Sequence, residues 1–310
     1  MSKLGIKNSV WFVLAESIKI YFSNIDKFFL YMLFPVFGQI IGIVLTFSLS
    51  LGFADKIVAK TDNPLHALLL VLLLAIPGLL IFVKAFWEYM IAYVALNSMT
   101  EGALNTGKVY DIPSHKQVAT QRTFQYVFFL IIVGVLSSLA TSIFFIIPGF
   151  VLWIYFILVY QTFTFESDLS VPEIFKRSFI LVRGNWLRTF IILAILTFFS
   201  IYIITEGVTV VFDYINITDK VCSLFNFISY QIPLDLTNKV LVYFKYQIIT
   251  PDMISKWIFV SILSFIVSGL TLPIRSITWT LWYKSLCEKK IETEKAERKS
   301  KRSKKENEAE

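Results

Sequence analysis

Long runs of apolar residues dominate the chain and decide its class. Residues 28 to 54 contain no charged side chain, and five further runs are apolar along most of their length. About 20 such residues in a helix cross a hydrocarbon core of about 30 Å. The pattern therefore predicts an all-α polytopic membrane protein with transmembrane helices at 28–53, 65–99, 124–147, 150–165, 186–205 and 257–286.

Two amphipathic segments stand directly before apolar runs. In residues 8–23, apolar side chains recur at three-and-four spacing, with Glu16 and Lys19 lying away from them, which is typical of a helix in the membrane interface. The second segment, SVPEIFKRSFILVRGN, carries its own boundary signals. Ser170 and Glu173 fit a capping box, and Gly184 occupies the position of a helix C-terminal glycine. We predict a capped interfacial helix with a polar face of Glu173, Lys176, Arg177 and Arg183.

These segments indicate an internal repeat. ESIKIYFSNIDKFF and RSFILVRGNWLRTF align without a gap, each before an apolar run, and a weaker copy precedes residues 124–147. We predict three units, each an interfacial amphipathic helix followed by a helical hairpin. The alternative is that any amphipathic helix entering a membrane span gives a similar pattern.

The connections between the runs are of two kinds. Ile147-Pro148-Gly149 lies between two apolar runs with no charge nearby and predicts a tight structural turn at Pro148 and Gly149. Residues 206–256 are interrupted by charges too often for a span, so we expect amphipathic helices lying against the outer surface. A re-entrant segment over 221–232 is the alternative. The predicted organisation is one membrane domain, 1–287, and a charged cytoplasmic tail, 288–310.

Composition agrees with a membrane protein and excludes several other classes. Apolar residues make up 56% of the chain, charged residues 16%, and the mean hydropathy is +0.68. Two cysteines and two histidines support neither a disulfide framework nor a metal cluster, and no cofactor is predicted. The net charge of +7 comes from loops and the tail, which favours membrane orientation over nucleic-acid binding. The bias of Lys and Arg places both termini in the cytoplasm.

Three charged residues lie within the predicted spans. Lys84 and Glu88 are one helical turn apart, and Arg275 falls at a similar inner depth. We consider a candidate inner charged cluster lining a cavity or docking surface, with Glu88 paired to Arg275 or Lys84. The alternative is that these side chains snorkel to the lipid headgroups. The basic block at 298–305 could likewise hold anionic lipid or a protein partner, or act only in orientation.

Several of these motifs together resemble a known family. The Ile147-Pro148-Gly149 turn, an acidic pair, EIFKRSFILVRGNWLRTF and the final LPIRSITWTLWYKSL are similar to the membrane domain found beside glycerophosphoryl diester phosphodiesterases, and to related six-span bacterial proteins. The match is best over residues 117–193. The resemblance implies a bacterial cytoplasmic membrane. The family's catalytic part is a separate soluble barrel for which this chain has no room, so its activity is not carried over.

No catalytic arrangement is visible in the sequence. It has no phosphate-binding glycine loop, no Ser-His-Asp arrangement and no paired carboxylates within a span. We therefore predict a non-catalytic membrane protein whose partners are the lipid bilayer and other membrane proteins, acting in assembly or lipid organisation. A transporter or channel for a small molecule or lipid is the alternative, supported by the repeat and by helix-breaking prolines at Pro77, Pro148 and Pro273.

Overall fold

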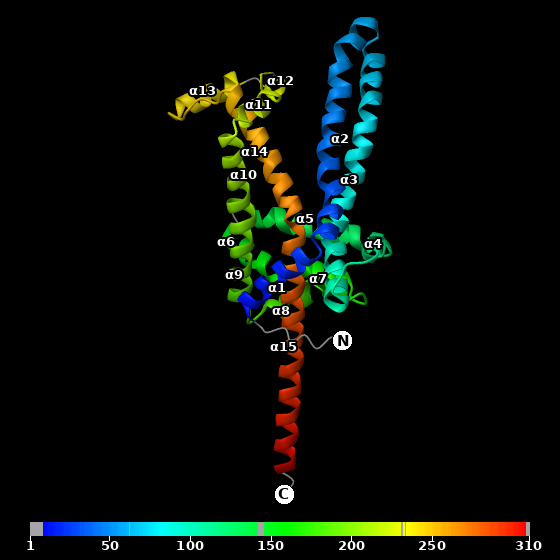
Figure 1. Cartoon of the computed structure of the whole chain (residues 1–310), viewed down its shortest axis with the longest axis vertical. Helices are drawn as coiled ribbons and strands as arrows, with labels where there is room; N and C mark the ends of the chain where they lie inside the picture. Colours follow the sequence, from blue (N-terminus) through cyan, green and yellow to red (C-terminus); the bar gives the residue numbers. More distant parts are fainter. Residues whose placement is uncertain (1–8, 62, 142–145, 231, 233, 308–310) are drawn as a thin grey trace. The chain divides into compact units, whose positions relative to one another are not determined.

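The computed structural model describes residues 9–61, 63–141, 146–230, 232 and 234–307, and every regular element among them is a helix (Figure 1). Five of the described helices are long and apolar enough to cross a membrane. The number rises to six if the bent pair Ile112–Thr120 and Thr123–Leu139 forms one span. The prediction of an all-α polytopic membrane protein is therefore confirmed.

Three short helices, α1, α4 and α8, each stand directly before an apolar helix. The elements are α1 (Val10–Ser23), α2 (Ile25–Lys60), α3 (Pro64–Thr106), α4 (Ile112–Thr120), α5 (Thr123–Thr141), α6 (Ile146–Tyr155), α7 (Val159–Phe165), α8 (Val171–Val182), α9 (Trp186–Thr197), the π-helix η2 (Phe198–Ile203), α10 (Ile204–Tyr214), α11 (Thr218–Ser223), α12 (Asn226–Ser229), α13 (Asp235–Tyr243), α14 (Pro251–Leu270) and α15 (Leu272–Asn307).

The chain divides into two compact units, and several helices contribute to both. Unit 1 comprises Met1–Gln39, Leu80–Ala194 and Leu272–Glu310. Unit 2 comprises Ile40–Leu79 and Ile195–Thr271.

In unit 1, both predicted amphipathic helices form, and both pack against other helices. Helix α1 lies against α15 and buries Val13, Leu14, Ser17 and Ile20. Ile18, which the sequence pattern placed on the apolar side, is 47% exposed. Helix α8 packs against α5, α6, α7 and α15, because its buried side of Val171, Ile174, Ser178, Leu181 and Val182 fits among them. Its predicted start is confirmed, since the Glu173 carboxylate accepts hydrogen bonds from the Ser170 backbone N–H and hydroxyl at 2.8 and 2.6 Å.

The predicted turn at Pro148 and Gly149 is wrong in position. Both residues lie in the first turn of α6, and the preceding residues 142–145 lie outside the described part of the chain. A proline is tolerated there because the first N–H groups of a helix have no acceptor within the helix. Helix α5 packs against α6, and the predicted span 150–165 lies within the candidate span Ile147–Phe165, although a short turn separates α6 from α7.

The last two predicted spans also differ from the structure. The span predicted at 186–205 continues through η2 and α10 to Tyr214, so the first part of the 206–256 region belongs to it. The span predicted at 257–286 is two helices, because α14 ends at Leu270 and α15 begins at Leu272. Pro273 fits this break, because a proline has no N–H to donate and is readily accommodated in the first turn of a new helix.

In unit 2, packing depends on close backbone approach and apolar contact. The α2–α3 pair leaves no space at Gly78, where an added Cβ would lie 2.3 Å from the Thr46 backbone nitrogen. Elsewhere in this unit, Phe259, Leu263 and Val267 of α14 form a core. Partly buried side chains complete it: Val208, Phe212, Val221, Cys222, Phe225 and Val260.

Candidate functional site

Buried polar side chains of unit 1 converge on Asn97 of α3. Its side-chain oxygen accepts hydrogen bonds from the Ser276 hydroxyl at 2.6 Å, the Thr280 hydroxyl at 3.1 Å and the Gln161 amide at 3.1 Å. Its amide nitrogen donates to the Thr164 hydroxyl at 3.1 Å. Asn97 is fully buried, so one side chain links α3, α7 and α15 away from solvent.

The geometry around Asn97 depends on helix periodicity. Ser276 and Thr280 are one turn apart on α15, and Gln161 and Thr164 are nearly one turn apart on α7, so each pair faces α3 together. Uncharged groups fill this region, and most satisfy one another. The exception is the Gln161 side-chain oxygen, which is buried without a hydrogen-bond partner.

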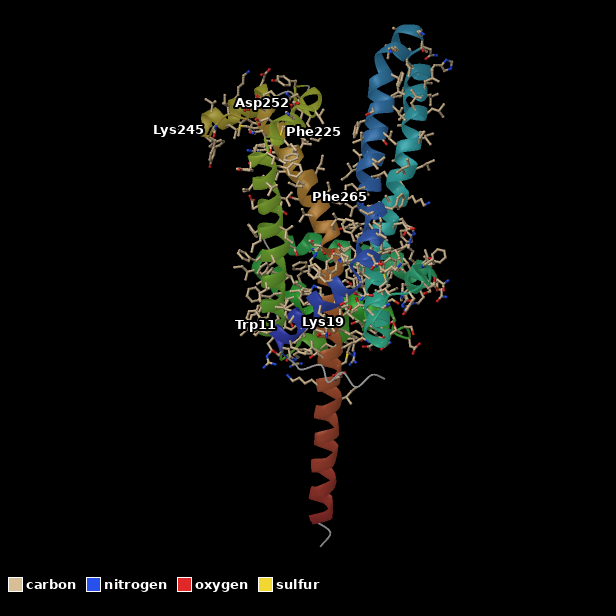
Figure 2. The ribbon with its side chains drawn as sticks, in the orientation of Figure 1. Trp11, Lys19, Phe225, Lys245, Asp252 and Phe265 are labelled. Atoms are coloured by element: carbon tan, nitrogen blue, oxygen red, sulfur yellow. The ribbon has the colours of Figure 1, made fainter. Side chains whose placement is uncertain are left out.

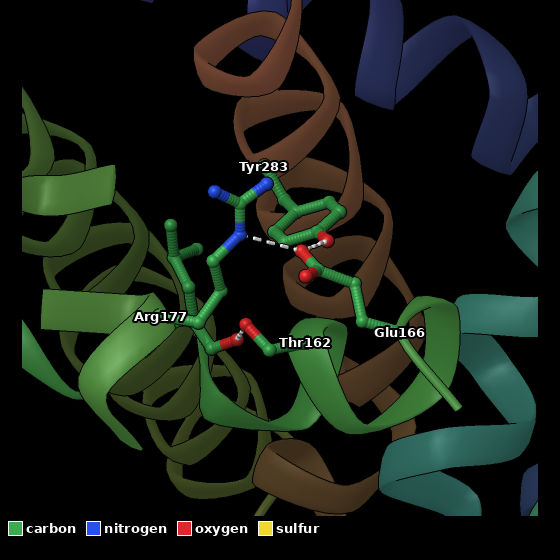
Figure 3. Close-up of polar contacts among 5 residues, drawn as sticks. Thr162, Glu166, Arg177 and Tyr283 are labelled. Carbon is green, nitrogen blue, oxygen red and sulfur yellow. Dashed lines mark hydrogen bonds and ion pairs between the residues drawn. The ribbon is translucent and has the colours of Figure 1, made fainter. Parts of the chain in front are cut away.

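A second polar group is centred on Glu166 (Figure 3), and its ion pair is partly exposed to solvent. One oxygen of Glu166 accepts from the Arg177 Nε at 2.8 Å and from the Tyr283 hydroxyl at 2.5 Å. Glu166 directly follows α7 as its C-cap residue, Arg177 lies within α8 and Tyr283 lies on α15, so three helices meet at one carboxylate. The side chains of Arg177 and Glu166 are 29% and 25% exposed.

The electrostatics of this group favour charged Arg177 and a protonated thiol at Cys287. Burial alone would lower the pKa of Arg177, but the hydrogen bond and charge of Glu166 raise it above its ordinary value. Burial raises the pKa of Cys287, although Arg177 and Tyr283 act in the opposite direction. The group therefore holds a stable ion pair and offers no activated thiolate nucleophile.

Unit 1 contains a further ion pair and a cation–π contact. Lys284 lies 2.6 Å from Glu101, and joins α15 to α3. The Arg122 guanidinium donates to the Phe163 carbonyl at 2.7 Å and lies 4.3 Å from the centre of the Phe163 ring. These contacts connect helices rather than leave charges directed at a ligand.

The candidate cluster of Lys84, Glu88 and Arg275 takes a different form from the predicted one. Glu88 pairs with Lys116 of α4 at 2.6 Å, while the Lys84 ammonium lies 5.7 Å from the centre of the Phe34 ring. Glu88 therefore contacts a short helix that the sequence analysis did not consider as its partner. Spacing along the sequence could not predict the distance between Glu88 and Lys116, because the two residues lie on different helices.

The other predicted site residues divide between the polar groups and the surface. Arg177 belongs to the Glu166 group, whereas Lys176 and Arg183 are exposed, and Pro148 and Gly149 are in neither group. Sequence reasoning missed the residues around Asn97. The available signal was polar side chains inside otherwise apolar runs, at helical spacing on the last predicted span.

The described part of the chain contains no group of three or more His, Cys, Asp or Glu residues arranged to hold a metal ion. No family model, no curated protein and no solved structure matches the chain. The resemblance to the phosphodiesterase-associated membrane domain therefore stays a prediction.

Proposed function

We propose that this chain is a non-catalytic integral membrane protein of the bacterial cytoplasmic membrane that serves in assembly with other membrane proteins or in lipid organisation. The resemblance noted in the sequence supports this placement. In this proposal both termini are cytoplasmic, so Glu166, Arg177 and Tyr283 lie at the inner side.

The observation that carries the proposal is the inward use of polar groups in unit 1. Asn97 bonds to side chains of two other helices, and Glu166 does the same. Pathways for ions or polar solutes need polar groups that line a water-filled route. Polar groups that bind one another instead specify which helices pack together, which is the property of a scaffold.

Flux measurements on the purified full-length protein in liposomes test the proposal against transport. We expect the release of protons, potassium and a small anionic dye, and the scrambling of labelled lipid, to match protein-free vesicles. Flux that depends on the protein and falls in an Asn97→Leu variant that remains folded would favour a transporter or channel and overturn the proposal.

Partner capture provides the positive arm. Crosslinking in the native membrane followed by purification should recover a defined membrane-protein partner, or a reproducible enrichment of one lipid class. Recovery of the chain alone, with bulk lipid composition, would contradict both the assembly and the lipid-organising role.

The proposed orientation has its own test. Single cysteines in place of Lys60, Lys220 and Lys299 report side by their reaction with an impermeant thiol reagent in intact cells. We expect positions 60 and 220 to react from outside and position 299 to be protected. Reaction of 60 and 299 from the same side would overturn the topology.

A further inference from the structure

Three exposed aromatic side chains gather at the end of α13 in unit 2. Tyr243, Phe244 and Tyr246 are 82%, 62% and 68% exposed, and they flank Lys245. We call residues 243–246 the aromatic tip. Removal of apolar surface from water is stabilising. Three neighbouring exposed rings leave that stabilisation unused, which is typical of an interaction surface.

The backbone of the aromatic tip has a defined conformation. Lys245 donates its N–H to the Val242 carbonyl at 3.0 Å, and Tyr246 donates to the Leu241 carbonyl at 2.8 Å. This is the closing pattern of a helix whose next residue is left-handed. Lys245 takes that position with φ of +60°, where a non-glycine residue is strained. Lysine stands where glycine would be easier, which favours a role for its side chain.

Asn238 fixes the segment that follows the aromatic tip. Its side-chain amide donates to the Ile249 carbonyl at 3.0 Å and accepts from the Ile249 N–H at 2.8 Å. One side chain thus satisfies both backbone groups of a residue outside the helix. The aromatic side chains of residues 243–246 therefore lie on a loop that these bonds close. This restriction lowers the entropy cost of ordering the side chains when they bind another surface.

The loop lies next to a membrane span. Helix α14 begins at Pro251 and is one of the helices apolar enough to cross the bilayer. At about 3.3 Å per extended residue, the segment from Tyr246 reaches at most about 17 Å from that point. Figure 2 shows α13 extending sideways from the start of α14, with Lys245 near its far end and Asp252 near α14. At the interface between membrane and water, tyrosine is enriched and lysine pairs with lipid phosphate.

We propose that the aromatic tip inserts into the interfacial layer of the bilayer that α14 crosses. The rings of Tyr243, Phe244 and Tyr246 lie at the boundary between headgroups and hydrocarbon, and Lys245 lies against phospholipid phosphates. The occupant of this surface is therefore the phospholipid bilayer itself. This inference goes beyond the proposed function, because it holds whether or not the chain conducts a solute.

Spin-label depth measurements test the insertion. In a full-length background with Cys222→Ser and Cys287→Ser, a nitroxide is attached at Phe244→Cys and the protein is placed in phosphatidylcholine–phosphatidylglycerol vesicles. Accessibility to oxygen relative to a water-soluble nickel chelate reports depth. We expect this ratio to be several-fold higher at 244 than at Lys220→Cys, an exposed position on α11, and to approach that at Val210→Cys on α10.

The outcomes separate insertion from exposure to water. A ratio at 244 equal to that at 220 would overturn the inference, and Tyr246→Cys provides a second site if the first label disturbs folding. Asn238→Ala should increase label mobility at 244 and lower the ratio. An unchanged ratio would show that the hydrogen bonds between Asn238 and Ile249 are not needed for insertion, and would overturn the role given to Asn238. Flux assays on the same vesicles test the proposed function separately.

Discussion

Units 1 and 2 use their polar side chains in different ways. Unit 1 contains side-chain hydrogen bonds within single helices, but it also contains bonds that join different helices, as when the Trp282 indole donates to the Thr189 hydroxyl at 3.0 Å. In the α2–α3 part of unit 2, hydroxyls bond within their own helix, with Thr46 donating to the Gly42 carbonyl at 2.8 Å. A hydroxyl bonded to its own helix gives no information about a neighbour. In unit 1, hydrogen bonds between helices help to determine which helices pack together. In the α2–α3 pair of unit 2, shape and apolar contact do so.

One polar cluster in unit 2 qualifies this contrast. The Ser255 hydroxyl donates to the Asn226 side chain at 2.8 Å and lies 2.8 Å from the Ser229 hydroxyl, so α12 is held against α14. This cluster resembles the group around Asn97 in its chemistry, but Asn226 is only half buried. The comparison suggests that burial, more than residue type, determines how much such a contact stabilises each unit.

The sharpest way to break the comparison is Asn97→Leu. The change leaves the buried donors of Gln161, Ser276 and Thr280 without their shared acceptor, so we expect unit 1 to lose about 3 kcal/mol. Unfolding in mixed micelles titrated with sodium dodecyl sulfate measures the loss. The matched change Asn226→Leu should cost about 1 kcal/mol, because Asn226 is only half buried and the Ser255 hydroxyl keeps its contact with the Ser229 hydroxyl. Equal losses would contradict the role assigned to burial.

Gly78→Ala probes shape in unit 2. The new methyl group would lie 2.3 Å from the Thr46 nitrogen and 2.7 Å from the Gly42 carbonyl oxygen, so α2 and α3 must separate. We expect a loss of about 2 kcal/mol in the same unfolding assay. Gly52→Ala is the control, since its methyl group would meet nothing within 4 Å. It should be neutral or slightly stabilising, and similar losses in both variants would show that close packing is not the cause.

Glu166→Gln tests the charged group of unit 1. The amide can still accept from Tyr283, but Arg177 loses its counter-charge in a half-buried position. Allowing for solvent screening, we expect a loss of about 1 kcal/mol. Glu101→Gln, which removes the charge facing the Lys284 ammonium, should cost about 0.5 kcal/mol because Glu101 is more exposed. A larger loss from the change at Glu101 would contradict the prediction that the Glu166–Arg177 pair stabilises unit 1 more than the Glu101–Lys284 pair does.

Acid should loosen the start of α8. Of the changes considered, we expect this one to have the smallest effect on stability. Hydrogen bonds from the Ser170 hydroxyl and backbone hold the pKa of Glu173 below its ordinary value of 4.5. The capping contribution is therefore complete above pH 4.5 and is lost as pH falls through the lowered folded pKa. Amide exchange at the first turn of α8 should rise in that range, and Glu173→Gln should remove the dependence. A pKa at or above 4.5 would refute the capping interaction.

Local rules were sufficient where one segment contains the whole signal. The start of α8 followed from Ser170 and Glu173, because a capping box joins residues three positions apart. They were insufficient at Pro148, because a proline after an apolar run fits either a turn or the first turn of a helix. Ile18 shows a similar limit: periodicity found an apolar side of α1, but α15 covers the neighbouring side.

The candidate site was beyond prediction from sequence for a different reason. Glu166, Arg177 and Tyr283 each belong to a motif visible in the sequence, yet Tyr283 is far from the other two along the chain. Which of many polar residues share one interior depends on how helices pack in three dimensions. Spacing within one helix fixes a direction around its own axis only.

The sequence by itself determined that this is an all-helical membrane protein, because uncharged runs of sufficient length have no other stable arrangement in lipid. It also determined the capped start of α8. Only the tertiary structure decided that Asn97 joins three helices, that Glu88 meets Lys116, and that Asn238 bonds to the backbone of Ile249. The physical reason is that hydrophobicity is a sum over residues, whereas a hydrogen bond requires two particular atoms to meet.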